Sequence, residues 1–77
     1  MGHFVMGQVT VTLNGRTFRL ACADGEEAQV LQLAGEVGER AQAIIAEFGR
    51  MSDDRVLLLA AIMLADELMQ ARLSAGA

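Results

Sequence analysis

The feature of this chain that most constrains its fold is an uninterrupted run of ten apolar residues, from Val56 to Ala65. A membrane-spanning helix needs roughly 20 such residues, and charged residues bound this run at 53–55 and at 66–67. The run therefore predicts a helix that is buried by protein. Because a helix that is apolar all round must be covered on several sides, we expect a second copy of the chain to supply part of the cover.

Length and composition restrict the class of protein further. The chain has 77 residues and a net charge of −4, so we expect one domain with a thin core and no clustered basic surface for nucleic acid. Cys22 and His3 each stand alone, so no disulfide and no metal site is expected within one chain. Residues 1–6 contain neither a basic n-region nor a long apolar segment, so we expect no signal peptide and a reducing, cytoplasmic location.

The first structural signal is a β-hairpin over residues 8–22, after an N-terminal extension (1–7) that we expect to be disordered. Residues 8–13 alternate polar and apolar, as in a half-buried strand, and Asn14-Gly15 is typical of a type I′ turn. The register that this turn sets pairs Leu13 with Arg16, Val11 with Phe18 and Val9 with Leu20. Arg16 then belongs to the apolar face but lies at the tip, so its guanidinium must reach solvent or a partner carboxylate.

Two helices are predicted after the hairpin, over about 25–48 and about 53–73, within a single domain over 8–77. Asp24 and Glu27 are spaced for a capping box at the first helix, and Gly49 and Ser52 are suited to end that helix and to begin the next. The apolar stripe of the first helix is Val30, Ala34, Val37, Ala41, Ile44 and Phe48, widened by Leu31, Leu33 and Ile45. Gly35 and Gly38 interrupt this helix; one could allow a close helix approach, but we favour the interpretation that both are merely tolerated.

The second helix carries two parallel apolar seams with the step of coiled-coil packing. The first seam is Leu57, Ala61, Leu64 and Leu68, and the second is Leu58, Ile62, Ala65 and Met69. We expect one seam to meet the chain's own first helix and hairpin and the other to meet a partner helix, with Val56, Leu59 and Met63 on the remaining side. The expected fold is thus α+β, a two-stranded antiparallel hairpin followed by two helices, dimerising through the long second helix.

Catalytic motifs are missing from this sequence. It contains no phosphate loop, no HExxH and no spacing typical of a nucleophile and its base, so we predict no enzyme activity, no cofactor and no metal. The acidic pairs at 53–54 and 66–67 are interpreted as helix-start and solvated charges. Cys22 ends the second strand on its inner face and is expected to be an inert buried thiol.

Three segments together resemble the ZapA family, bacterial division proteins that bind the tubulin-like GTPase FtsZ. They are the hairpin VTVTLNGRTFR (9–19), the segment CADGEE (22–27) and the helical segment LLAAIMLADEL (58–68). The resemblance implies a non-enzymatic protein that binds FtsZ protofilaments at the mid-cell division site and promotes their bundling and Z-ring assembly during septation. It also implies a homodimer, and a tetramer where a longer C-terminal helix continues the coiled coil.

The resemblance also implies which residues bind the filament. Basic residues at the hairpin turn and the interhelical loop, with an acidic residue at the start of the second helix, serve this role in the family. The corresponding residues here are Arg16, Arg50 and Asp54, with Thr17 and Arg19 from the same hairpin surface. Two other interpretations are a generic homodimerisation or adaptor module for another cytoplasmic protein and a DNA-binding dimer of the antitoxin type; the net negative charge disfavours the second.

Overall fold

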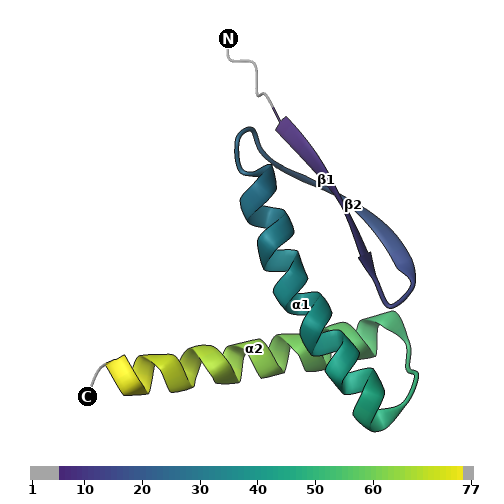
Figure 1. Ribbon diagram of the computed structural model, residues 1–77, viewed down its shortest axis with the longest axis vertical. Coiled ribbons are helices and arrows are strands. Elements are labelled where there is room, and N and C mark those ends of the chain that lie inside the picture. The colour runs from purple at the N-terminus through teal and green to yellow at the C-terminus, as the bar shows by residue number, and fades with distance from the viewer. Residues whose placement is uncertain (1–5, 76–77) are drawn as a thin grey trace.

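The chain has the α+β fold that the sequence predicts, a hairpin followed by two helices (Figure 1). This computed structural model describes residues 6–75. The elements are β1 (Met6–Leu13), β2 (Arg16–Ala23), α1 (Glu27–Phe48) and α2 (Asp53–Ala75). Strand β1 thus begins two residues before the predicted hairpin, so Met6 and Gly7 of the predicted extension are part of a strand. The rest of that extension, with His3, lies outside the described residues.

The hairpin has the predicted turn and the predicted register. Asn14 and Gly15 both have positive φ, 56° and 76°, as a type I′ turn requires. Leu13 pairs with Arg16, Val11 with Phe18 and Val9 with Leu20. At the open end of the hairpin Cys22 pairs with Gly7 and is buried, and burial raises the pKa of its thiol, with a further increase from nearby carboxylates such as that of Glu27.

The predicted capping box at the start of α1 is wrong. Helix α1 begins at Glu27, and the residue before it makes no capping hydrogen bond through its side chain. The reason is a tight turn, in which Gly25 has φ 91° and the Glu26 N–H donates to the Ala23 carbonyl at 3.0 Å. The Glu27 carboxylate instead accepts a hydrogen bond from the Gly25 N–H at 2.9 Å. It also fills the space beside Gly7, where a Cβ would collide with it.

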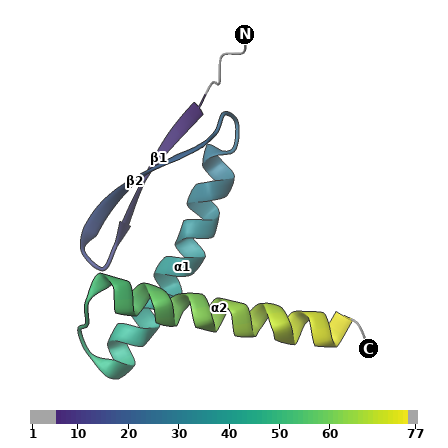
Figure 2. The same cartoon turned by 180° about the vertical axis from the view of Figure 1, so that it is seen from behind.

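The junction between the helices is formed as predicted. Gly49 follows the last residue of α1 with φ 87°, and its N–H donates to the Ile45 carbonyl at 2.8 Å. Such a left-handed residue after a helix favours glycine. Ser52 directly precedes α2, and its carbonyl accepts the Val56 N–H at 3.0 Å. The chain therefore reverses within four residues, and α2 leaves across the end of α1 (Figures 1 and 2).

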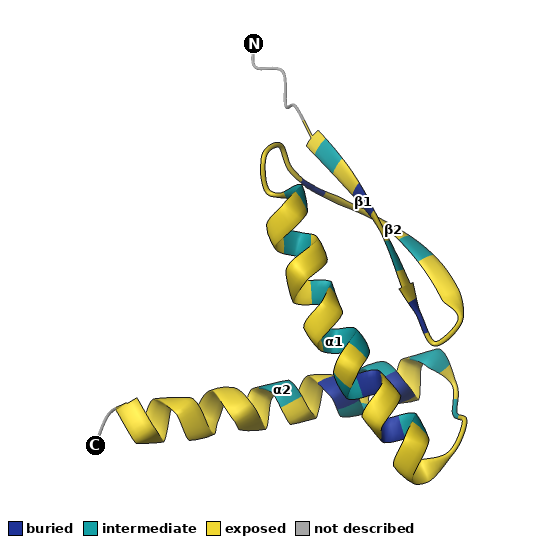
Figure 3. Cartoon of the chain, in the orientation of Figure 1, coloured by how far each residue is buried: buried dark blue, intermediate teal, exposed yellow. Residues whose placement is uncertain are grey.

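The core lies where α2 crosses α1 beside the tip of the hairpin (Figure 3). Its buried residues are Leu13, Ala41, Ile44, Val56 and Ala60. Neither predicted seam supplies the fully buried row against α1, which is Val56 and Ala60, although Leu57 of the first seam packs against this core. Since α2 runs across α1 rather than along it, this buried row is confined to the first two turns of α2. Beyond it Glu67 still bonds to Arg40 of α1, and the C-terminal end of α2 projects away (Figure 1).

The fold leaves much apolar surface uncovered within one chain. Of the predicted α1 stripe, Ala41 and Ile44 are buried but Phe48 is exposed, as are Leu31 and Leu33. The molecule measures 47 × 39 × 17 Å, and a helix with side chains is about 10–12 Å across. In this flat molecule one chain does not enclose α2, because Leu58, Ile62 and Met69 are 61%, 55% and 60% exposed.

Candidate protein-interaction surfaces

The hairpin tip is attached to the start of α2 by hydrogen bonds to one carboxylate. Asn14 Nδ2 donates to Asp53 Oδ1 at 2.7 Å, and Arg16 Nη1 donates to Asp53 Oδ2 at 3.0 Å. Asn14 Nδ2 also lies 3.4 Å from the Met51 carbonyl oxygen. These bonds from Asn14 and Arg16 lower the pKa of the Asp53 carboxyl. We call Asn14, Arg16 and Asp53 the tip latch, because together they fix the turn against α2.

Arg16 remains available to a partner despite the latch. Its side chain is 67% exposed, against 26% for Asp53, and its guanidinium carbon lies 5.6 Å from the centre of the Phe18 ring. The sequence predicted that Arg16 would reach solvent or the carboxylate of a binding partner, whereas in the single chain it is already paired with Asp53. An exposed ion pair of this kind contributes little to stability, so the arginine can re-pair with an incoming carboxylate without loss of the fold.

The other filament-binding candidates are spread over the same end of the domain and along β2. Thr17 faces Thr12 across the hairpin, with their hydroxyl oxygens 3.4 Å apart. Arg19 lies further along β2 and donates to Gln8 Oε1 at 3.1 Å. Asp54 is exposed; its pKa is lowered by the Ser52 hydroxyl and then by the Arg55 N–H. Asp53, which the sequence analysis did not single out for this role, is the acidic residue that reaches the hairpin.

Arg50 and the hairpin turn line one cleft of about 510 Å³. Residues 12–15 form one wall of this cleft. The opposite wall comes from Gly38, Ala41, Gln42 and Ile45 on α1, and Arg50 from the interhelical loop completes the lining. The structure therefore brings the predicted loop arginine and the predicted hairpin turn to the same opening. We call this opening the tip cleft.

A second cluster of charges fixes α2 on α1. Arg40 donates to Glu67 through two nitrogens, Nε at 3.0 Å and Nη2 at a shorter distance, and Nη1 donates to Glu36 Oε1 at 2.6 Å. The hydrogen bonds from Arg40 lower the pKa of the Glu67 carboxyl, and the bonds to Glu67 and Glu36 raise the pKa of the Arg40 guanidinium. The sequence analysis missed the pair, because 27 positions separate the two residues and no local pattern links them.

The predicted dimerisation residues run along α2, from Leu57, which packs against the core, to Met69 on the part that projects from the domain. The exposed members of this set are Leu58, Ala61, Ile62, Ala65, Leu68 and Met69, and the half-buried members are Leu57 and Leu64. We call this set the α2 face. Neighbouring exposed apolar side chains on one helix are unusual for a soluble monomer, so the α2 face is the most extensive candidate for contact with another chain.

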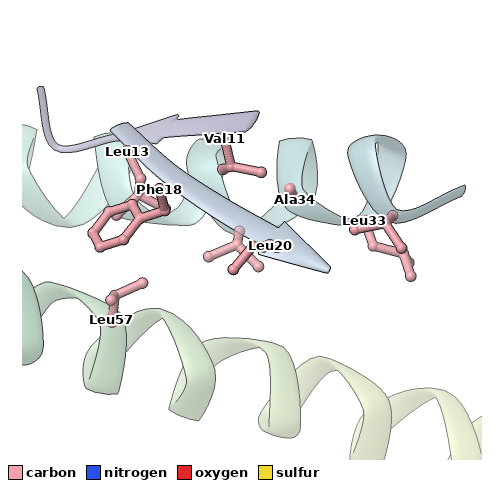
Figure 4. A pocket seen from close by; sticks show the side chains of 9 residues that line it. Val11, Leu13, Phe18, Leu20, Leu33, Ala34 and Leu57 are labelled. Atoms are coloured by element: carbon pink, nitrogen blue, oxygen red, sulfur yellow. The ribbon is translucent and has the colours of Figure 1, made fainter. Parts of the chain in front are cut away.

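An apolar groove of about 370 Å³ continues this surface towards the hairpin (Figure 4). Val11, Phe18 and Leu20 line it from the hairpin and Leu57 lines it from α2. Helix α1 supplies the remaining wall through Val30, Leu33, Ala34 and Val37. Helix α1 therefore covers the apolar face of the hairpin only in part, and Leu20 is 42% exposed.

Two features of other functional classes are absent from residues 6–75. In that range no three His, Cys, Asp or Glu side chains are grouped to hold a metal ion. Neither helix of that range has both the length and the apolarity needed to cross a membrane. What the described residues do present is an exposed apolar helix face, an apolar groove and a charged hairpin tip. This combination defines a protein–protein interaction domain.

Comparison with known proteins identifies the family. The sequence profile described as "Cell division protein ZapA" matches residues 9–77, which is nearly the whole chain. The chain belongs to the ZapA family, as the sequence analysis predicted, and this is a family of non-enzymatic cell-division proteins.

An uncharacterized protein of Rickettsia prowazekii (strain Madrid E) is 37% identical over 54 residues, which cover 70% of this chain and 51% of the relative. The chain thus spans about half the length of that relative. No solved structure matches the chain.

Proposed function

We propose that this protein binds FtsZ protofilaments and bundles them, and so promotes Z-ring assembly at the mid-cell division site in the cytoplasm. The observation that carries the proposal is the family match over residues 9–77, which includes both the hairpin tip and α2. The mechanism requires no reaction. Two or more copies of a weak binding surface, held in one assembly, gain avidity without any new contact.

The assembly that links these surfaces is a homodimer formed through the α2 face. The exposed apolar residues of α2 support this, as does the total surface. One chain exposes 5957 Å², whereas a compact monomer of 8.2 kDa exposes roughly 4,500 Å². A standard interface covers about 800 Å² of each partner, so a dimer would remove much of this excess.

The filament-binding surface is the end of the domain formed by the hairpin tip and the interhelical loop. Arg16 is its central residue, because its side chain is charged, largely exposed and already oriented by Asp53. Arg50 and Asp54 lie in the adjoining loop and helix start, and Thr17 and Arg19 extend the surface along β2. Arginine suits this role, because its guanidinium can donate two parallel hydrogen bonds to one carboxylate.

The experiment is co-sedimentation with FtsZ from the same organism, polymerised with GTP. We expect wild type to pellet with the filaments and Arg16→Ala to bind about tenfold more weakly, the effect of losing about 1.4 kcal/mol at one interface residue. The matched control is Arg72→Ala, which removes the same charge from an exposed residue in the last turn of α2.

The control must pellet like wild type, and both variants must keep the wild-type circular-dichroism melt and dimer mass. Equal pelleting of Arg16→Ala and wild type would exclude the hairpin tip as the site. If wild type itself stays in the supernatant, the protein is an interaction module for a different partner.

A further inference from the structure

The pair formed by Arg40 and Glu67 lies where α2 leaves the rest of the domain. Within residues 6–75 it is the one hydrogen-bonded contact between a side chain of α1 and a side chain of α2. Glu67 lies on the same face of α2 as the buried Ala60, about two turns further along the helix. All described residues of α2 after Glu67 are exposed. The pair is therefore the outermost hydrogen-bonded attachment of α2 to the domain.

The charges around Arg40 make this attachment depend on its guanidinium. The side chain of Arg40 is only 19% exposed. Its guanidinium pairs with Glu36 at 2.6 Å and Glu39 at 3.6 Å on its own helix, and with Glu67 across the helix crossing. Three carboxylates thus share one cation, and they would repel one another without it. The guanidinium is what holds this part of α2 against α1.

Two polar attachments together fix the direction of α2. The tip latch joins the hairpin to Asp53, the first residue of α2, and Arg40 joins α1 to Glu67, roughly 21 Å further along the helix. Packed helices tolerate about 20° of scatter in their crossing angle, and a rotation of that size at Ala60 would move the end of α2 by about 8 Å. The short buried row alone therefore does not determine where the α2 face points.

We propose that Arg40 and Glu67 are positioning residues, which set the angle between the α2 face and the hairpin tip and thereby the relative orientation of the two hairpin tips in the dimer. This inference rests on the proposed function. Bundling requires the two tips to engage neighbouring filaments at once, and linked sites lose their avidity when geometry forbids this. Binding of one tip to one filament has no such requirement. The pair therefore controls bundling without contributing to the filament contact.

A charge reversal with rescue tests the pair. Glu67→Arg sets two guanidinium groups against each other, and the double variant Arg40→Glu/Glu67→Arg restores an attractive pair with the charges exchanged. The matched control is Asp66→Arg, which makes the same change in charge at the adjacent exposed residue, one that is not an ion-pair partner of Arg40.

The angle of α2 is measured without FtsZ, by electron–electron double resonance between spin labels at Gln32→Cys on α1 and Gln70→Cys on α2. Both positions are exposed, whereas the natural Cys22 is buried. Dilution with unlabelled chains restricts the measurement to distances within one chain. We expect Glu67→Arg to shift or broaden the distance by up to about 8 Å, and the double variant and the control to match wild type.

Bundling is then measured with GTP-polymerised FtsZ and saturating protein, at a concentration where sedimentation equilibrium shows the wild-type dimer. High-speed pelleting reports binding to all filaments, and low-speed pelleting reports bundles alone. Glu67→Arg should pellet with the filaments at high speed as wild type does, but should lose most of the FtsZ from the low-speed pellet. The double variant should recover it, and Asp66→Arg should keep it.

The outcomes separate this inference from the proposed function. If wild type does not pellet with FtsZ, the proposed function fails, and the role of the pair in bundling fails with it. If wild type bundles filaments, an unchanged label distance in Glu67→Arg, or a changed distance with undiminished bundling, overturns only the inference. A double variant that behaves like Glu67→Arg, or a loss of the dimer mass in Glu67→Arg, also overturns it. If Glu67→Arg does not fold, Glu67→Gln takes its place, with Asp66→Asn as its control.

Discussion

Truncation of Ile62 on the α2 face should weaken the proposed homodimer by an amount that follows from the exposure of this side chain. Ile62 is 55% exposed in a single chain, and full burial of such a side chain is worth about 1.5–3 kcal/mol. Covering the exposed half therefore contributes about 1 kcal/mol per chain. A two-fold interface contains the residue twice, so Ile62→Ala should cost the dimer about 2 kcal/mol, or roughly a thirtyfold rise in its Kd.

Sedimentation equilibrium over a range of concentrations measures this Kd directly. The contrasting variant is Val56→Ala, which truncates a residue buried within the chain itself and should lower the melting temperature at every protein concentration. For Ile62→Ala, the loss in melting temperature should be small at concentrations below both dimer Kd values and should grow to a plateau as concentration rises, because association stabilises the folded chain by mass action and does so less in the variant. A dimer Kd within twofold of wild type would show that Ile62 is outside the interface and would refute the reasoning.

The core, the tip latch and the helix glycine can each be tested by one substitution. Val56→Ala removes two carbons from a site with 0% exposure and should lower the free energy of unfolding by about 2 kcal/mol, measured by urea denaturation. In the folded protein the pKa of Asp53 is below its usual value. Its ionised carboxylate therefore stabilises the fold above the unfolded pKa, and this stabilisation is lost as pH falls through the folded pKa. Between about pH 6 and about pH 3 the melting temperature of Asp53→Asn should fall less than that of wild type. Gly38→Ala should raise the free energy of unfolding by up to about 1 kcal/mol, because the helix gains propensity and no clash arises; a less stable variant would mean that the glycine is needed by the fold.

Local sequence patterns were sufficient to predict the hairpin and the helix junction. Asn14-Gly15 fixes both the turn type and the register, because few residue pairs adopt two successive positive φ angles. Gly49 likewise marks the end of α1 through its own backbone conformation. The family could also be predicted from the sequence, because residues 9–77 carry the hairpin and the apolar helix in the order that the family profile matches.

Contacts between residues far apart in the sequence could not be predicted from such patterns. The periodicity of α2 is nearly uniform around the helix, so it could not distinguish Val56 and Ala60 as the row that meets α1. The capping box was predicted from spacing alone, and the turn at Gly25 removed Asp24 from the helix start. Asp53 and Arg40 find their partners 37 and 27 residues away. Those pairings depend on where the chain reverses, which no short motif encodes.

The measurement that tests the central claim most directly is negative-stain electron microscopy of GTP-polymerised FtsZ, with and without the wild-type protein at a concentration where sedimentation shows the dimer. A dimer that presents the hairpin-tip surface twice should convert single protofilaments into lateral bundles, because each copy engages a different filament. Protofilaments that remain single, although the protein is dimeric and saturating, would contradict the account.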